Sequence, residues 1–161
     1  LDRSSAASDV YKRQHLHGFP PGSHAPADVD FVYFDPADLS AEQEAAITRH
    51  LRAAAPDAPW EVVNQARVHL WRRDSLGQPP PPARSLAEGI AAWPETATCV
   101  GVALTVDEQV RIVAPHGLAD LFALVLRPSP GADRQAYAHR LAAKRHAETW
   151  PRLSIIHCDI S

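Results

Sequence analysis

The stretch DVDFVYFD, residues 28–35, constrains the fold of this 161-residue chain more than any other part of the sequence. Its β-branched and aromatic residues favour a β-strand. The run ends at Pro36, which cannot donate to a strand ladder. Because both faces of the run are apolar, we expect a strand buried on both sides, inside a sheet that helices cover.

Asp28 and Asp30 flank Val29 at the start of this strand. Residues i and i+2 of a strand point to the same face, roughly 7 Å apart. Two carboxylates so placed repel each other unless a cation lies between them. Two Mg²⁺ ions about 4 Å apart are able to share such a pair during a phosphoryl displacement. The spacing alone favours an ordinary surface role, with Asp28 capping a turn and Asp30 facing solvent.

Apolar periodicity and capping patterns predict the elements around this strand. Ser40 with Gln43, and Ser85 with Glu88, form capping boxes ahead of two helices. Alternating apolar and polar residues predict a second strand over residues 60–71. The remaining expected elements are a hairpin of 98–104 and 109–114, helices over 118–126 and 133–150, and an edge strand over 153–157. We therefore expect an α/β (α+β) architecture, a small mixed sheet flanked by helices.

Composition limits the partners. The net charge is −3 and no basic stripe is present, so no nucleic-acid surface is evident. Cys99 and Cys158 are the two cysteines, and their separation gives neither a metal-ligand spacing nor a disulfide framework. The longest strongly apolar run is too short to cross a bilayer. We expect a cytoplasmic protein without a membrane partner.

Residues 1–14, LDRSSAASDVYKRQ, differ from everything that follows. They show no clear hydrophobic period, and the chain contains no methionine, even at position 1. We expect residues 1–14 to be a non-native or disordered tail that adds no element to the sheet. The domain would then span residues 15–161.

Several stretches, taken in order, resemble one family. They are LHGFPP, DVDFVYFDPADLS, NQARVH, WPETATCVGV, APHGLADLFALVLRP and WPRL. Together they resemble the bacterial nucleotidyltransferase-like family, which is built on the DNA polymerase β-type fold. The resemblance implies a core in which an acidic pair on a central strand binds Mg²⁺ and a nucleoside triphosphate. The enzyme passes a nucleotidyl group to an acceptor hydroxyl. Asp28 and Asp30 match that pair, as catalytic and metal-binding residues.

The resemblance also implies features that this sequence does not show clearly. The superfamily carries a glycine-rich turn and a basic residue upstream of the acidic pair, where a helix start holds the triphosphate. Residues 1–14 occupy that place, so we expect a truncated copy without its first strand and helix, and with little or no activity. The superfamily's third carboxylate stays unassigned. Glu61 is the available acidic residue on the second strand, but we interpret it as a solvent-facing strand residue.

Asn64 and Arg67, in the NQAR motif, are the candidate substrate-binding residues. The planar fork of Arg67 suits a phosphate, and it suits a structural ion pair equally well. Trp93 and Trp150 each precede a proline, and we interpret both as packing anchors.

Three functions remain open at this point. The first is a metal-dependent nucleotidyltransferase that uses a nucleoside triphosphate and an unknown acceptor. The alternative is a catalytically inactive nucleotide- or partner-binding relative with the same fold. A phosphohydrolase is the third hypothesis, although no second cluster of His and Asp supports it.

Overall fold

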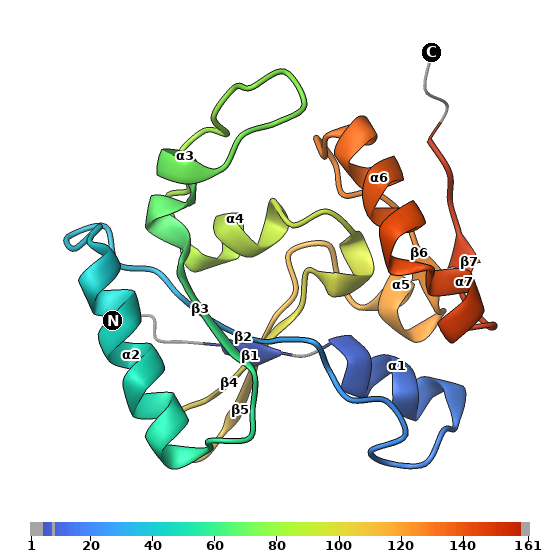
Figure 1. Cartoon of the computed structure of the whole chain (residues 1–161), viewed down its shortest axis with the longest axis horizontal. Coiled ribbons are helices and arrows are strands. Elements are labelled where there is room, and N and C mark those ends of the chain that lie inside the picture. Colours follow the sequence, from blue (N-terminus) through green and yellow to red (C-terminus); the bar gives the residue numbers. More distant parts are fainter. Residues whose placement is uncertain (1–4, 8, 159–161) are drawn as a thin grey trace.

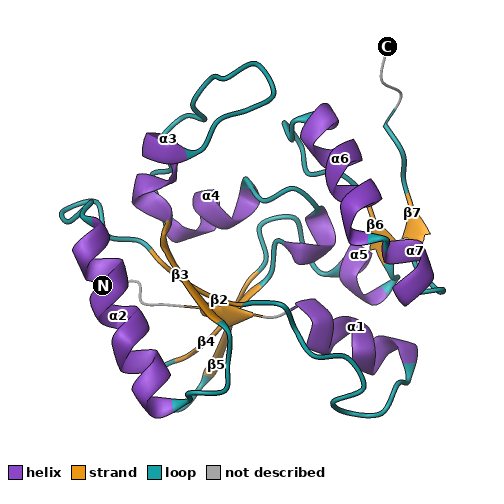
Figure 2. Cartoon of the chain, viewed as in Figure 1, coloured by secondary structure: helices purple, strands orange, loops and turns teal. Residues whose placement is uncertain are grey.

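A computed structural model describes residues 5–7 and 9–158 (Figures 1 and 2). A five-stranded sheet lies at its centre, in the order β3-β2-β1-β4-β5. These strands are β1 Ser5–Ala7, β2 Val29–Tyr33, β3 Trp60–Asn64, β4 Gly101–Leu104 and β5 Val110–Val113. β2 and β3 are parallel, whereas β1 runs antiparallel to both of its neighbours and β4–β5 is an antiparallel hairpin. The expected mixed sheet flanked by helices is confirmed.

Seven helices and a small second sheet accompany these strands in the described residues. The helices are α1 Asp9–His17, α2 Ala41–Ala54, α3 Val68–Trp71, α4 Leu86–Ala91, α5 Ala119–Phe122, α6 Arg134–Lys144 and α7 His146–Thr149. Two 3₁₀ turns, η1 Gln65–Arg67 and η2 Thr96–Thr98, lie between them, and β6 Val125–Leu126 pairs in parallel with β7 Ser154–Ile155. Nowhere in residues 5–7 and 9–158 does a helix have the length and apolar character needed to cross a membrane.

The two faces of β2 and β3 have different partners. On one face Val32 packs with Leu86 and Ile90 of α4 in a buried cluster, and Val63 packs against the same cluster. On the other face lies α2, where the Tyr33 hydroxyl donates to Gln43 Oε1 over 3.0 Å. β2 is therefore interior to the sheet and covered on both faces, as its apolar run predicted.

The prediction that residues 1–14 add nothing to the sheet is wrong. Ser5, Ala6 and Ala7 pair with Val32, Phe31 and Asp30, respectively. β1 and α1 therefore both precede β2 along the chain. An unpaired edge on an interior strand would leave its backbone polar groups unsatisfied, so the sheet gains by pairing there. Backbone pairing needs no side-chain period, so no pattern in residues 5–7 indicated this strand.

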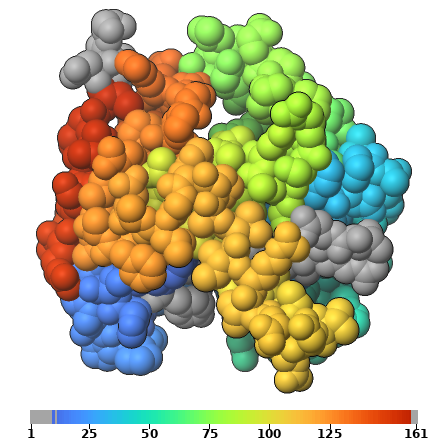
Figure 3. Space-filling view, turned by 180° about the vertical axis from the view of Figure 1, so that it is seen from behind, coloured from blue at the N-terminus to red at the C-terminus, as the bar shows by residue number. Residues whose placement is uncertain are grey.

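The end of α1 matches its sequence signal. Gly18 has a φ of 74° and its N–H donates to the carbonyl of His15 over 3.0 Å. A left-handed glycine is a common end of a helix. Beyond it, α1 lies beside the C-terminal elements, because Arg152 Nη1 donates to the carbonyl of Leu16 over 2.8 Å (Figure 3). The end of α1 therefore contacts the turn that follows α7.

The second strand is shorter than predicted. β3 ends at Asn64, whose side chain accepts from the N–H of Ala66 and starts the 3₁₀ turn η1. Such local capping competes with a strand ladder. Of the two predicted capping boxes, Ser85 does accept from the N–H of Glu88, whereas the side chain of Ser40 makes no cap hydrogen bond.

The C-terminal elements also depart from the periodic pattern. α5 covers only Ala119–Phe122, because Leu124 adopts a left-handed φ of 55° before the chain enters β6. The long helix predicted over 133–150 is split between α6 and α7 at Arg145, whose φ is 45°. The predicted final strand exists as β7, but it pairs with β6 rather than with the main sheet.

Candidate active site

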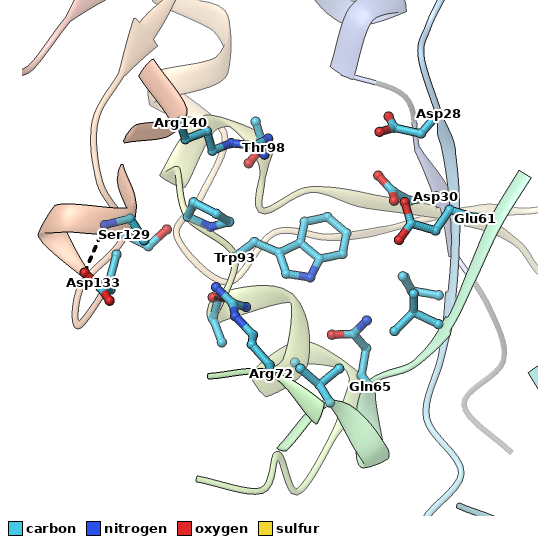
Figure 4. Close-up of a pocket in the computed structure, with 18 of the residues that line it drawn as sticks. Asp28, Asp30, Glu61, Gln65, Arg72, Trp93, Thr98, Ser129, Asp133 and Arg140 are labelled. Carbon is cyan, nitrogen blue, oxygen red and sulfur yellow. Dashed lines mark hydrogen bonds between the residues drawn. The ribbon is translucent and has the colours of Figure 1, made fainter. Parts of the chain in front are cut away.

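Three carboxylates lie together on two neighbouring strands. Asp28 directly precedes β2, Asp30 lies within it, and Glu61 is the register partner of Asp30 on the parallel strand β3. All three project from one wall of the same cavity (Figure 4). Asp28 and Asp30 are partly buried and Glu61 is exposed. The expected pairing of Asp28 with Asp30 is present, and the fold adds Glu61 to it.

The cavity in front of these carboxylates has a volume of about 1070 Å³. That is large enough for a nucleotide. The β2 and β3 carboxylates form one wall, and the opposite side is made by residues 129–133 and α6 (Figure 4). Trp93 lies between the two walls, with Gln65 and Arg72 beside it (Figure 4).

Cationic side chains line the cavity from α1 and α6. They are Lys12 and Arg13 from α1 and Arg140 and Lys144 from α6. Arg13 is buried, and its Nη1 lies 2.9 Å from Nδ1 of the buried His146. These groups lie within one cavity with the three carboxylates, so the cavity carries both the acidic groups that suit a metal and the basic groups that suit a phosphate chain.

A buried ion pair anchors α6. Glu95 is fully buried, and Arg140 Nε donates to its Oε1 over 2.5 Å. The hydroxyl of Thr98 donates to Oε2 of the same carboxylate over 3.2 Å. A buried carboxylate without a cation costs several kcal/mol of stability, so Glu95 holds the Arg140 guanidinium beside it. This contact fixes the position at which Arg140 lines the cavity.

Gln65 is held by a close approach to α4. Its side chain is 5% exposed, and it lies against Gly89, where any added Cβ would meet Gln65 at 2.5 Å. Trp93 packs on the buried cluster of Val32, Ile90 and Cys99 with one side and lines the cavity with another. Trp93 is thus a packing residue, as interpreted from the sequence, and a wall of the cavity as well.

Asn64 and Arg67 do not reach across the cavity, contrary to the expectation. Asn64 is fully buried, and its amide joins the loop after β2: it accepts from the N–H of Asp35 and donates to the carbonyls of Asp35 and Asp38. Arg67 pairs with Glu44 of α2 and donates to the carbonyl of Leu39. Both side chains stabilise the α2 side of the sheet. Asn64 lies on the face of β3 opposite Glu61, and η1 takes the place of the strand on which Arg67 was expected.

The carboxylate set suits a hard cation, but does not enclose one. In residues 5–7 and 9–158, no three His, Cys, Asp or Glu side chains converge closely enough to hold a metal ion by themselves. Mg²⁺ commonly takes one or two carboxylates and completes its shell with substrate phosphates and water. Asp28 and Asp30 fit that shared kind of site.

A mixed sheet with carboxylates on adjacent parallel strands, facing a cavity that also carries cations, is suited to phosphoryl transfer. The profile of a family described as nucleotidyltransferase matches residues 9–155. The chain belongs to this nucleotidyltransferase family, as its motifs indicated.

One solved structure supports the same conclusion. It is described as an NMR structure that reveals a CCA-adding enzyme head domain, and it is 26% identical to this chain. The match covers 98% of this chain and 83% of the other, with a TM-score of 0.76. No curated protein gives a significant match.

Sequence reasoning missed three residues of this cavity. Glu61 was considered and set aside, because one acidic residue on a strand carries no signal until the register places it beside Asp30. Gln65 lies within the NQAR motif, where no local pattern distinguishes it from Asn64 and Arg67. Arg140 gave no local signal, since its position depends on the buried contact with Glu95.

Proposed function

We propose that this protein is a metal-dependent nucleotidyltransferase that moves a nucleotidyl group from a nucleoside triphosphate to an acceptor hydroxyl. The observation that carries the proposal is the placement of Asp28, Asp30 and Glu61 on adjacent strands, in a cavity that also holds the cations of α1 and α6. The nucleotidyltransferase family supports the reaction class. We place the reaction in the cytoplasm, where nucleoside triphosphates are made.

Each carboxylate has a distinct role in this proposal. Asp28 and Asp30 would hold Mg²⁺ together with the phosphate oxygens of the substrate. When bound, Mg²⁺ stabilises the negative charge that develops on the transferred phosphoryl group. Glu61, next to Asp30 in the register, accepts the proton of the acceptor hydroxyl. This proton transfer frees the acceptor oxygen to attack the α-phosphorus, and pyrophosphate leaves.

The cations have the complementary task. Arg140 and Lys144 of α6 line the cavity from one helix face, and Lys12 and Arg13 of α1 line it from another. A guanidinium or ammonium group beside the triphosphate offsets its charge and orients the leaving pyrophosphate. The buried Glu95 keeps Arg140 in position without removing it from the cavity.

A second candidate is a nucleotide-binding relative that no longer turns over. The observation in its favour is that the described acidic residues form no three-ligand metal cluster. Such a protein would bind a Mg²⁺-nucleotide through the cavity and leave it unchanged.

The test combines nucleotide transfer and melting temperature for Asp28→Asn and Asp30→Asn, with and without Mg²⁺. Asparagine removes the charge and keeps the shape of each side chain. We expect both variants to lose Mg²⁺-dependent transfer without unfolding, and to melt at or above the wild-type temperature because the carboxylate repulsion is relieved. Unchanged transfer in both variants would refute the enzyme. If wild type shows no transfer, but Mg²⁺-ATP raises its melting temperature and the variants lose that shift, the binding relative is correct.

A further inference from the structure

Gln65 carries a polar amide at a nearly buried position where the fold does not use its hydrogen-bonding groups. It is 5% exposed and lines the cavity, yet within residues 5–7 and 9–158 no group hydrogen-bonds to its side-chain amide. The neighbouring Asn64 shows the contrast, because every polar atom of its amide has a protein partner. A nearly buried amide that faces a cavity without a protein partner is suited to a ligand.

Trp93 places an aromatic ring beside this amide. The indole and the Gln65 amide both project into the middle of the cavity (Figure 4). The indole is fixed from behind by the cluster of Val32, Ile90 and Cys99. A ring held in this way offers a rigid flat surface that loses little entropy when a second ring stacks on it.

We propose that Gln65 and Trp93 form the nucleobase subsite of this cavity, an inference that rests on the proposed function. The base stacks on the Trp93 indole. The Gln65 amide then hydrogen-bonds to the edge of the base, with its carbonyl accepting from one ring substituent and its N–H₂ donating to the adjacent acceptor. An edge that presents a donor next to an acceptor, such as that of adenine or cytosine, matches this amide.

The direction of the chain supports this placement. Gln65 directly follows β3, whose other end carries Glu61, so the amide and the carboxylates are joined by one rigid strand. In Figure 4, Gln65 and Arg72 lie at one end of the cavity, Asp28 and Arg140 lie toward the other, and the Trp93 indole lies between them. A nucleotide with its base against Trp93 would extend its phosphates past Asp30 toward the cations of α1 and α6.

The chemistry favours a base over other ligands of this cavity. A nucleobase is a flat aromatic ring that can cover the indole, and base–aromatic stacking strengthens nucleotide binding. The amide adds selectivity, because a site built to hydrogen-bond a polar edge rejects a ligand that lacks it. Triphosphate recognition alone needs neither Gln65 nor Trp93.

The experiment measures binding by calorimetry in Mg²⁺, for ATP, CTP, GTP, UTP and inorganic tripolyphosphate. Gln65→Met keeps the side-chain length and removes both hydrogen-bonding groups. We expect it to weaken binding of the preferred nucleotide by about tenfold or more, and to leave the affinity for tripolyphosphate within about twofold of the wild-type value. Trp93→Leu should weaken all four nucleotides by about tenfold through lost stacking. Gln109→Met, on the exposed hairpin, is the matched control and should bind as wild type.

The outcomes separate the two proposals. If wild type binds nucleotides and neither Gln65→Met nor Trp93→Leu changes affinity or preference, the base subsite is wrong, whatever the transfer assay shows. If the variants behave as expected but wild type transfers nothing, the subsite stands and the enzyme proposal falls. A wild type that binds neither nucleotide nor tripolyphosphate refutes both. Equal losses for tripolyphosphate and nucleotides would show a general collapse of the cavity, and would also overturn the subsite.

Discussion

A Cβ atom added to Gly89 would lie 2.5 Å from the Cβ atom of Gln65. No real pair of side chains is this close, so glycine at this position is what lets α4 approach η1 while Gln65 points into the cavity. Gly89 thereby positions a residue of the proposed base subsite without touching the ligand itself.

The first prediction concerns Gly89→Ala. Alanine normally stabilises a helix interior by about 0.5–1 kcal/mol relative to glycine. Here the forced displacement of Gln65 should reverse the sign and cost about 1–3 kcal/mol, measured by urea denaturation. Base preference should weaken together with stability. Ala87→Gly, at an exposed position of the same helix, is the control and should show the ordinary propensity loss. A stabilised Gly89→Ala protein would contradict the close contact.

The second prediction tests the structural role of Asn64. Replacing it with alanine leaves the N–H of Asp35 and the carbonyl of Asp38 without their amide partner in a buried site. The free energy of unfolding should fall by about 2–4 kcal/mol. Gln135→Ala, an exposed amide on α6, should change it by less than about 0.5 kcal/mol. If stability were unchanged and nucleotide affinity fell, the original interpretation of Asn64 as a substrate-binding residue would be restored.

The sequence predicted those parts of the fold that depend on local composition. The apolar run of 29–33 specified a strand covered on both faces, because this signal is contained within a few neighbouring residues. Asp28 and Asp30 were identified by their spacing together with the family resemblance, since the spacing alone favours an ordinary surface role.

What the sequence did not predict depends on contacts between distant residues. Glu61 joins the acidic pair only through the register of β3 with β2. β1 is made by backbone pairing, which has no side-chain pattern. The alternation of polar and apolar residues continues past Asn64, although the strand ends there. The strand ends because the Asn64 amide bonds to Asp35 and Asp38, which are distant in the sequence.

The third prediction concerns the buried pair of Glu95 and Arg140. Arg140→Met leaves a fully buried carboxylate without its cation and should lower the free energy of unfolding by about 3–5 kcal/mol. Adding Glu95→Gln should recover part of that loss. Arg84→Met breaks the exposed pair with Glu88 on α4 and should cost less than about 1 kcal/mol. Thermal and urea unfolding measure all three variants. Equal losses of stability for the two arginine variants would show that burial of Glu95 does not increase the stability cost of removing its cation.

The fourth prediction is a dependence on alkaline pH. Tyr137 is buried, and its hydroxyl donates to the carbonyls of Leu126 and Ile156, which joins α6 to β6 and the end of β7. Burial, followed by the charge of Glu95, raises the pKa of Tyr137 from 10.0 to about 12. Because the pKa is higher in the folded chain than in the unfolded chain, the protonated hydroxyl stabilises the folded state. This contribution to the free energy of unfolding is fully present below pH 10 and is lost as the pH rises from 10 to 12.

The measurement compares wild type with Tyr137→Phe by urea denaturation across that range. Phenylalanine cannot ionise, so the stability of wild type relative to the variant should fall by about 2–3 kcal/mol between pH 10 and 12. Below pH 10 the difference should be constant. A difference that stays constant up to pH 12 would show that Tyr137 ionises as easily in the folded as in the unfolded chain.

The fifth prediction separates Glu61 from the metal-binding pair. Glu61→Gln removes the proposed proton acceptor and keeps the hydrogen-bonding shape of the side chain. It should lower kcat by about 10²–10⁴-fold, the usual contribution of a general base, while Mg²⁺-ATP binds nearly as well as to wild type. Asp30→Asn, at the register partner of Glu61 on β2, should lose binding and turnover together, because it removes a proposed ligand of the metal. Glu42→Gln, exposed on α2, should change neither kcat nor binding. If Glu61→Gln transferred nucleotides at the wild-type rate, Glu61 would be the solvent-facing strand residue first inferred from the sequence, and the proton of the acceptor would have to leave through Asp28, Asp30 or water.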